Sequence, residues 1–158
     1  MAYNNTKNII VINGPNLNFL GKRNPKIYGN QTIDEIDKYI LKHFNEENVK
    51  IVFWQSNHEG EIIDKIQEAD MLTFDNGESM IFGIVLNPGA YGHYSYAIRD
   101  AIESIDLPVV EVHISDVNRR EAFRKNLVLS DVCEKTIIGQ GAMGYIEAIE
   151  HLIWLSKN

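Results

Sequence analysis

The run Ile9-Ile10-Val11-Ile12, followed by the polar turn Asn13-Gly14-Pro15-Asn16, decides the fold class of this chain. Four consecutive apolar, mostly β-branched residues are typical of a strand that is covered on both faces, as in a parallel sheet. The turn opens a long connection, Asn13–Tyr28, before Thr32-Ile33-Asp34-Glu35, a capping box that predicts the start of a helix. Connections of this length between a strand and a helix are usually functional loops or lids.

Strand and helix signals alternate along the rest of the chain. Strands are expected at Asn8–Ile12, Lys50–Gln55, Met80–Asn87, Val109–His113 and Lys135–Ile138. Helices are expected at Ile33–Glu46, Gly60–Asp70, Tyr94–Ile105 and Ala142–Leu155, with a short one at Asn118–Asn126. This alternation predicts an α/β fold, a flavodoxin-like, doubly wound, five-stranded parallel sheet in the order 2-1-3-4-5 with helices on both faces. No linker interrupts it, so we expect a single domain over residues 1–158.

Composition excludes several classes of protein. The chain has 158 residues, and no apolar run reaches the roughly 20 residues that a membrane-spanning helix needs. Its formal net charge of −7, without a basic stripe, argues against binding to nucleic acid or to an anionic membrane. The N-terminus, Met1–Lys7, leads directly into a strand, so we expect no secretory signal. The single cysteine, Cys133, rules out an internal disulfide and favours a reducing cytoplasm.

Polar residues follow the strands that meet at the centre of the predicted sheet. In doubly wound sheets, ligands bind beyond the carboxyl ends of the strands, where the strand order reverses. The first strand leads to Asn16, and the third ends in Asn87 shortly before His93. The fourth strand ends in Glu111 and His113. We therefore expect one pocket that is lined by amides, imidazoles and a carboxylate.

Glu111 places a carboxylate inside a strand that should be buried. Glu111 and His113 are two residues apart, so their side chains leave the same face of the strand. An unpaired buried carboxylate is costly, and a neighbouring imidazole removes much of that cost while the carboxylate orients the ring. The pair is therefore either a satisfied structural ion pair or a catalytic acid with its partner. Exceptions to the rule that buried strand residues are apolar tend to occur at functional sites, which favours the second interpretation.

The remaining candidates each have a plain structural alternative. Tyr28 is either an aromatic residue packed at the sheet edge or a base, and it can act as a base only as a phenolate, which a guanidinium such as that of Arg23 stabilises. Arg23 by itself is also consistent with a solvated surface position. His93 fits a helix cap as well as a site residue. The arginines of the predicted short helix form either a solvated basic face or an anion clamp; they are Arg119, Arg120 and Arg124.

The stretch Gly139–Gly144 matches the pattern Gly-x-Gly-x-x-Gly but does not predict a dinucleotide site. That fingerprint belongs to the first strand–helix turn and needs an acidic residue on the next strand. Here no further strand follows. We interpret the glycines as permitting a tight turn and close helix packing. The sequence also carries no phosphate-binding Gly-x-x-x-x-Gly-Lys loop and no set of metal ligands with sensible spacing, so we expect neither cofactor nor metal.

Taken together, the motifs resemble those of type II 3-dehydroquinate dehydratase, nearly end to end and in the same order. The segments that carry the resemblance are Asn13–Asn18, Gly21–Gly29, Gln55–Gly60, Asn87–Tyr91 with His93, Ala97–Ala101, Pro108–Ser115, Arg120–Arg124 and Gly144-Tyr145. The resemblance implies removal of water from 3-dehydroquinate to give 3-dehydroshikimate, with no metal or organic cofactor. It implies Tyr28 as the base with help from Arg23, Asn16 as a group that stabilises the enolate through water, and His113 as the acid oriented by Glu111.

The resemblance also implies how the substrate is held. The carboxylate would be bound by Asn87 and the backbone of Ile114 and Ser115, and the ring hydroxyls by His93 and Arg124. Asp100 would reach the site of a neighbouring subunit, which implies a homo-oligomer, a dodecamer built from trimers. The alternative that we keep open is a flavodoxin-like module that binds flavin or another small ligand, although Asn13-Gly14-Pro15-Asn16 lacks the hydroxyl groups of a flavin phosphate loop.

Overall fold

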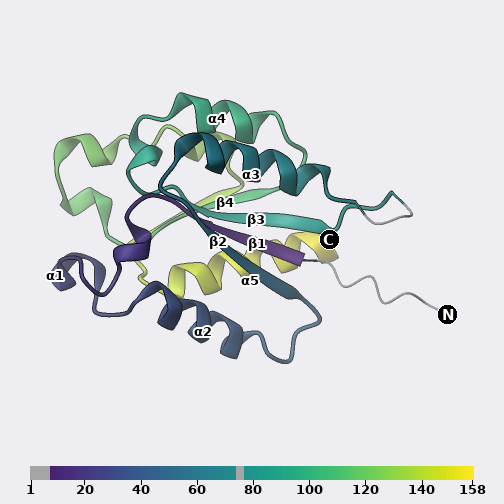
Figure 1. Ribbon diagram of the computed structural model, residues 1–158, viewed down its shortest axis with the longest axis horizontal. Coiled ribbons are helices and arrows are strands. Elements are labelled where there is room, and N and C mark those ends of the chain that lie inside the picture. The colour runs from purple at the N-terminus through teal and green to yellow at the C-terminus, as the bar shows by residue number, and fades with distance from the viewer. Residues whose placement is uncertain (1–7, 74–76) are drawn as a thin grey trace.

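The computed structural model describes residues 8–73 and 77–158, so the expectation about Met1–Lys7 lies outside it (Figure 1). Its sheet consists of β1 (Asn8–Asn13), β2 (Lys50–Gln55), β3 (Ile81–Asn87), β4 (Val109–His113) and β5 (Lys135–Ile138). Neighbouring strands are parallel, in the order β2-β1-β3-β4-β5. The predicted fold class and strand order are confirmed, and every strand boundary lies within one residue of its prediction.

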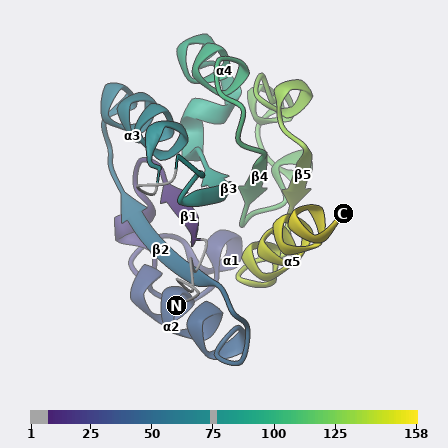
Figure 2. The same cartoon turned by 90° about the vertical axis from the view of Figure 1, so that its right-hand side faces the viewer.

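Helices cover both faces of the sheet. They are α1 (Pro25–Tyr28), α2 (Ile33–His43), α3 (Glu59–Met71), α4 (Tyr96–Glu103) and α5 (Met143–Lys157). Figures 1 and 2 show α3 and α4 on one face and α2 and α5 on the other. The carboxyl ends of the strands point to the left in Figure 1, toward α1. No helix of the described ranges is both long and apolar enough to cross a bilayer.

Alternate residues of β1 supply the two halves of the core. Ile9 and Val11 belong to the buried cluster that contains residues of α2 and α5. Ile10 and Ile12 belong to the cluster that contains residues of α3 and α4. Successive side chains of a strand leave opposite faces, so an unbroken apolar run is what a strand covered on both faces requires.

The capping box at the start of α2 is present as predicted. The Thr32 hydroxyl oxygen accepts a hydrogen bond from the backbone N–H of Glu35 at 3.2 Å, and a Glu35 carboxylate oxygen accepts one from the backbone N–H of Thr32 at 2.8 Å. The helix ends at His43, three residues before the predicted end. The fourth helix begins at Tyr96, two residues later than predicted, because the Ser95 hydroxyl accepts a hydrogen bond from Ile98 N–H and caps the helix there.

The predicted short helix Asn118–Asn126 is wrong. The segment forms two separate 3₁₀ turns, Val117–Arg119 and Ala122–Lys125, with Arg120 in an extended conformation between them. The long first connection is also more ordered than a plain loop, because it contains a 3₁₀ turn at Leu17–Phe19 as well as α1. Asn24 caps α1 by accepting a hydrogen bond from the backbone N–H of Lys26. A further 3₁₀ turn, Gly89–His93, follows β3.

The connections that follow β1 and β3 lie in direct contact. The backbone N–H of Gly14 donates a hydrogen bond to the carbonyl oxygen of Asn87 at 2.8 Å. A Cβ atom at position 14 would lie 2.6 Å from the carbonyl oxygen of Pro88, closer than any real side chain tolerates. Glycine at this position therefore allows the two connections to meet at the carboxyl edge of the sheet.

Asp37 on α2 is half-buried, and burial raises the pKa of its carboxyl group from 3.8 to about 6, with the negative charge of Asp34 adding to the effect. Over the interval between these values the unfolded chain has released a proton that native Asp37 still holds. This group therefore lowers the free energy of unfolding as pH rises from about 4 to about 6.

We expect Asp37→Asn to remove this pH dependence. The variant should gain stability relative to the original chain at pH 7, on the order of 1 kcal/mol once solvent screening of a half-exposed group is allowed for, and little or none at pH 4. Urea unfolding at both pH values measures the difference. An equal change at pH 4 and pH 7 would contradict the assignment of a shifted carboxyl group.

Candidate active site

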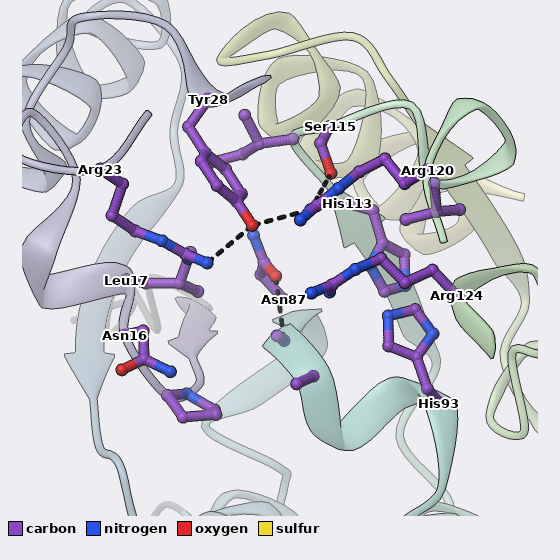
Figure 3. Close-up of a pocket in the computed structure, with 15 residues that line it drawn as sticks. Asn16, Leu17, Arg23, Tyr28, Asn87, His93, His113, Ser115, Arg120 and Arg124 are labelled. Atoms are coloured by element: carbon purple, nitrogen blue, oxygen red, sulfur yellow. Dashed lines mark hydrogen bonds between the residues drawn. The ribbon is translucent and has the colours of Figure 1, made fainter. Parts of the chain in front are cut away.

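A pocket of about 120 Å³ lies at the carboxyl ends of β1, β3 and β4 (Figure 3). The structure brings most of the predicted site residues to its wall. Those that line it are Asn16, Arg23, Tyr28, Asn87, His93, His113, Ile114, Ser115 and Arg124. Glu111 does not line the pocket but contacts His113, and Asp100 lies elsewhere on the chain.

Tyr28 projects into the pocket from the end of α1 with two guanidinium groups at its hydroxyl oxygen (Figure 3). Arg23 donates a hydrogen bond to this oxygen at 2.6 Å, and Arg120 donates another at 2.7 Å. The Cζ atom of Arg23 also lies 3.8 Å from the centre of the Tyr28 ring. Two guanidinium groups thus direct N–H donors at one phenol oxygen.

The contact of Arg120 with Tyr28 was not predicted from the sequence. The two residues are 92 positions apart, and Arg120 was considered only as part of a basic face or an anion clamp. Arg120 has an extended backbone conformation between two 3₁₀ turns, and its side chain contacts Tyr28 and Ser115, whose hydroxyl accepts a hydrogen bond from Arg120 at 3.3 Å. Arg120 and Arg124 both line the pocket and both contact the Glu121 carboxylate, although no continuous helix joins them.

His113 and Glu111 form a buried pair behind the pocket. The Nε2 atom of His113 lies 2.7 Å from Oε1 of Glu111, which is 0% exposed. An ionised carboxylate can only accept, so Nε2 of the ring carries a proton and Nδ1 is the nitrogen available to a ligand. Gly92 lies against the pair, since a Cβ atom there would be 3.1 Å from Cε1 of His113.

The second oxygen of Glu111 is held by two hydroxyl groups. Oε2 accepts a hydrogen bond from Ser130 at 2.8 Å and another from Thr136 at 3.2 Å. Thr136 lies directly opposite Glu111 in the pairing of β4 with β5. Neither hydroxyl was predicted to take part in the site. Thr136 could have been found from the pairing of β4 with β5, because a hydroxyl residue opposite a buried carboxylate is well placed to donate a hydrogen bond to it.

His93 stacks against His113, with ring centroids 5.9 Å apart. Burial lowers the pKa of His93 below its usual value, while a contact between Nδ1 and the carbonyl oxygen of Asn126 at 3.0 Å acts in the opposite direction. A carbonyl can only accept, so Nδ1 carries the proton. The neutral ring then offers an Nε2 lone pair as an acceptor for a ligand hydroxyl.

Asn16 begins the 3₁₀ turn after β1 in a left-handed conformation, with φ of 65°. Asparagine tolerates this region better than most residues. Its backbone N–H donates a hydrogen bond to Oδ1 of Asn57 at 2.9 Å, and Gln55 donates to the same oxygen. The end of β2 and its turn therefore hold the Asn16 loop in place, a contact that we did not predict.

Among the predicted site residues, Asp100 alone neither lines this pocket nor contacts a residue that lines it, within the part of the chain that the structure describes. It lies exposed on α4. The pocket of a single chain is therefore formed without it, and a role for Asp100 requires a second copy of the chain.

The glycine-rich stretch after β5 has the conformation of a tight turn. Gly139 and Gly141 have φ of 74° and 56°, and a Cβ atom at Gly144 would lie 3.3 Å from a side-chain carbon of Val112 on β4. These features fit the turn and close helix packing expected from the sequence. Within residues 8–73 and 77–158, no three His, Cys, Asp or Glu side chains are grouped as a metal site would require.

Comparison with known proteins gives a consistent result. Residues 7–153 match the family described as dehydroquinase class II. The chain is 52% identical over 146 residues to a Clostridium botulinum (strain Hall) protein named 3-dehydroquinate dehydratase, covering 92% of this chain and 94% of that protein. It is 49% identical over 144 residues to a Bacillus pumilus protein of the same name, covering 91% and 92%.

A solved structure extends the likeness to three dimensions. The type II dehydroquinase from Butyrivibrio crossotus is 52% identical in sequence and superposes with a TM-score of 0.85. The alignment covers 93% of this chain and 97% of that chain. The family match over residues 7–153 includes all five strands and the segments that form the pocket.

We expect Ser130→Ala to destabilise the protein by about 1–3 kcal/mol, because it removes a hydrogen bond donor from a fully buried carboxylate. Thermal or urea unfolding at pH 7 measures the change. Ser156→Ala is the matched control, since the Ser156 hydroxyl donates only to the Ile153 carbonyl near the exposed end of α5. Equal stability of the two variants would show that Glu111 does not depend on Ser130.

Proposed function

The chain belongs to the dehydroquinase class II family, and we propose that it is a lyase that removes water from 3-dehydroquinate to give 3-dehydroshikimate, a step of the shikimate pathway. The observation that carries the assignment of roles is the placement of the Tyr28 hydroxyl, between two guanidinium groups, in the same pocket as the His113–Glu111 pair.

The protein must assist three chemical steps of this reaction. A proton next to the ketone must be removed, the resulting enolate must be stabilised, and a hydroxyl group must leave as water. A base and an acid on different walls of one pocket perform the first and third steps on the same substrate. The pocket has both kinds of group, from segments that are far apart in the sequence.

Tyr28 is the proposed base. A phenolate is needed to accept the proton, and the hydrogen bonds from Arg23 and Arg120 stabilise that anion in the free enzyme. After proton transfer the two guanidinium groups remain at the neutral phenol, so they do not need to move during the step. Arg120 therefore joins Arg23 in the proposed catalytic set.

His113 is the proposed acid. With Nε2 donating to Glu111, a proton on Nδ1 is the one that can be given to the leaving hydroxyl group. The buried carboxylate accepts the hydrogen bond from Nε2 and fixes the orientation of the ring. Water then leaves, and the ring returns to its neutral form with Nε2 still bound to Glu111.

Other residues bind the substrate in this proposal. Asn16 stabilises the enolate through a water molecule, and His93 and Arg124 bind ring hydroxyl groups. The carboxylate is bound by Asn87 and by the backbone N–H groups of Ile114 and Ser115. The segment with Arg23 and Tyr28 closes over the substrate and excludes water from the reacting atoms. Support comes from the fact that all these residues line the same pocket.

The proposal extends to the assembly and its location. The chain forms a single catalytic domain over residues 1–158 and acts in the cytoplasm as a dodecamer built from trimers. Asp100 then contributes to the site of a neighbouring subunit, which its exposed position on α4 permits. The flavin-binding or small-ligand module that we kept as an alternative is not favoured by the family match.

We expect Tyr28→Phe to lower kcat by about 10²–10⁴-fold, the usual contribution of a general base. The assay is the growth of absorbance from the conjugated enone product after addition of 3-dehydroquinate, with a chelator present. Tyr39→Phe is the control, because the Tyr39 hydroxyl contacts Sδ of Met143 outside the pocket. Activity of Tyr28→Phe close to that of Tyr39→Phe would remove Tyr28 from the mechanism.

We expect Arg120→Gln to lower kcat about 10- to 100-fold, because a hydrogen bond between charged groups at the proposed phenolate contributes roughly 1.5–3 kcal/mol. The adjacent Arg119→Gln variant is the control, since the Arg119 side chain is 86% exposed and pairs with Asp116. Steady-state kinetics of both variants decide the matter. A loss that is equal in the two variants would indicate a general charge effect and no specific role for Arg120.

A further inference from the structure

Tyr145 on α5 carries a buried hydroxyl group that joins the ends of two strands. The side chain is 2% exposed. Its hydroxyl donates a hydrogen bond to Oδ1 of Asn13 at 2.7 Å, at the end of β1. The same hydroxyl accepts a hydrogen bond from Nδ2 of Asn87 at 2.8 Å, at the end of β3. Burial raises the pKa of Tyr145, so this hydroxyl is neutral and keeps its proton near neutral pH.

The direction of this hydrogen-bond chain is fixed at one end. The backbone N–H of Gly89 points at the Asn87 side chain, and the distance is 3.2 Å. A backbone N–H can only donate, so the amide atom that faces Gly89 is the oxygen. The nitrogen of Asn87 therefore faces Tyr145, the Tyr145 oxygen accepts, and the Tyr145 proton goes to Asn13. Each hydrogen bond in the chain determines the next.

The consequence for the pocket is a defined polarity at Asn87. The oxygen of the amide is used by Gly89, whereas the nitrogen carries two hydrogens and gives one of them to Tyr145. Figure 3 shows the Asn87 amide oxygen at the end of a dashed hydrogen bond and the nitrogen on the other side of the amide group. Asn87 therefore offers the ligand a donor, which suits an anionic oxygen and does not suit another donor.

We propose that Tyr145 is a positioning residue that holds the Asn87 amide with an N–H toward the substrate carboxylate. This inference rests on the proposed function, in which Asn87 binds that carboxylate. Tyr145 itself does not line the pocket. Its effect is on how strongly the carboxylate is held, in the ground state and in the transition state alike, and not on the transfer of protons. Such uniform binding appears in KM and leaves kcat nearly unchanged.

The test is Tyr145→Phe, which removes one oxygen and keeps the ring that packs in the core. We expect KM for 3-dehydroquinate to rise about tenfold, the value of one charge-assisted hydrogen bond, while kcat stays within twofold. Binding of two inactive probes is measured by calorimetry: quinate, in which the ketone is a hydroxyl group, and its primary carboxamide. The variant should bind quinate about tenfold more weakly and the carboxamide within twofold of the original affinity.

Ile149→Val is the matched control. Ile149 is buried on the same helix one turn after Tyr145, so the substitution loosens the packing of α5 without removing a hydrogen bond. A rise in KM in the control equal to that in Tyr145→Phe would overturn the proposal, and so would an equal loss of affinity for the two probes. If Tyr145→Phe does not fold, Asn13→Leu removes the acceptor of the Tyr145 proton and should give the same selective loss for quinate.

Different results would refute the proposed function and the positioning role of Tyr145. An original chain that does not convert 3-dehydroquinate would refute the proposed function, and the probe pair would still report whether Tyr145 holds the Asn87 amide in position for a carboxylate. An original chain that is active, together with a Tyr145→Phe variant that loses kcat at unchanged KM, would refute the positioning role alone.

Discussion

The site depends on a negative charge that is buried inside the sheet. Glu111 is fully enclosed on β4, so each of its oxygens must be given hydrogen bond donors. One oxygen binds the ring of His113, and the other binds the hydroxyl groups of Ser130 and Thr136. The requirement to satisfy this carboxylate therefore fixes the ring at the pocket, the turn before β5 and the register of β4 with β5. The contacts that satisfy the buried carboxylate are the same ones that orient the proposed acid.

The opposite wall of the pocket is organised by a different means. Tyr28 sits on a single short helical turn within a long connection, and its hydroxyl is held by one arginine nearby in the sequence and one far from it. The charges are partly exposed and lie on segments outside the sheet. The proposed acid is thus part of a buried strand, whereas the proposed base belongs to a connection outside the sheet, where Tyr28 is only partly buried against the core. This division suits a reaction in which one wall must admit the substrate and the other must already be in place.

The strands were predictable because their apolar runs are dictated by burial on both faces, and each observed strand agrees with its prediction to within one residue. Helix ends were less predictable, since a side-chain cap such as that of Ser95 decides them locally. The error at Asn118–Asn126 had a larger effect, because a continuous helix does not show the extended backbone that Arg120 adopts between two 3₁₀ turns. Contacts between residues far apart in sequence, such as Arg120 with Tyr28 and Tyr145 with Asn13, follow from tertiary packing that no local pattern encodes.

The contact between Gly14 and Pro88 limits how this scaffold can be altered. The two connections meet with no room for even a methyl group, and both carry residues of the pocket. Any side chain at position 14 would force one of the two connections onto a different path. A change of binding specificity that alters this contact would therefore require that the connections after β1 and β3 be redesigned together.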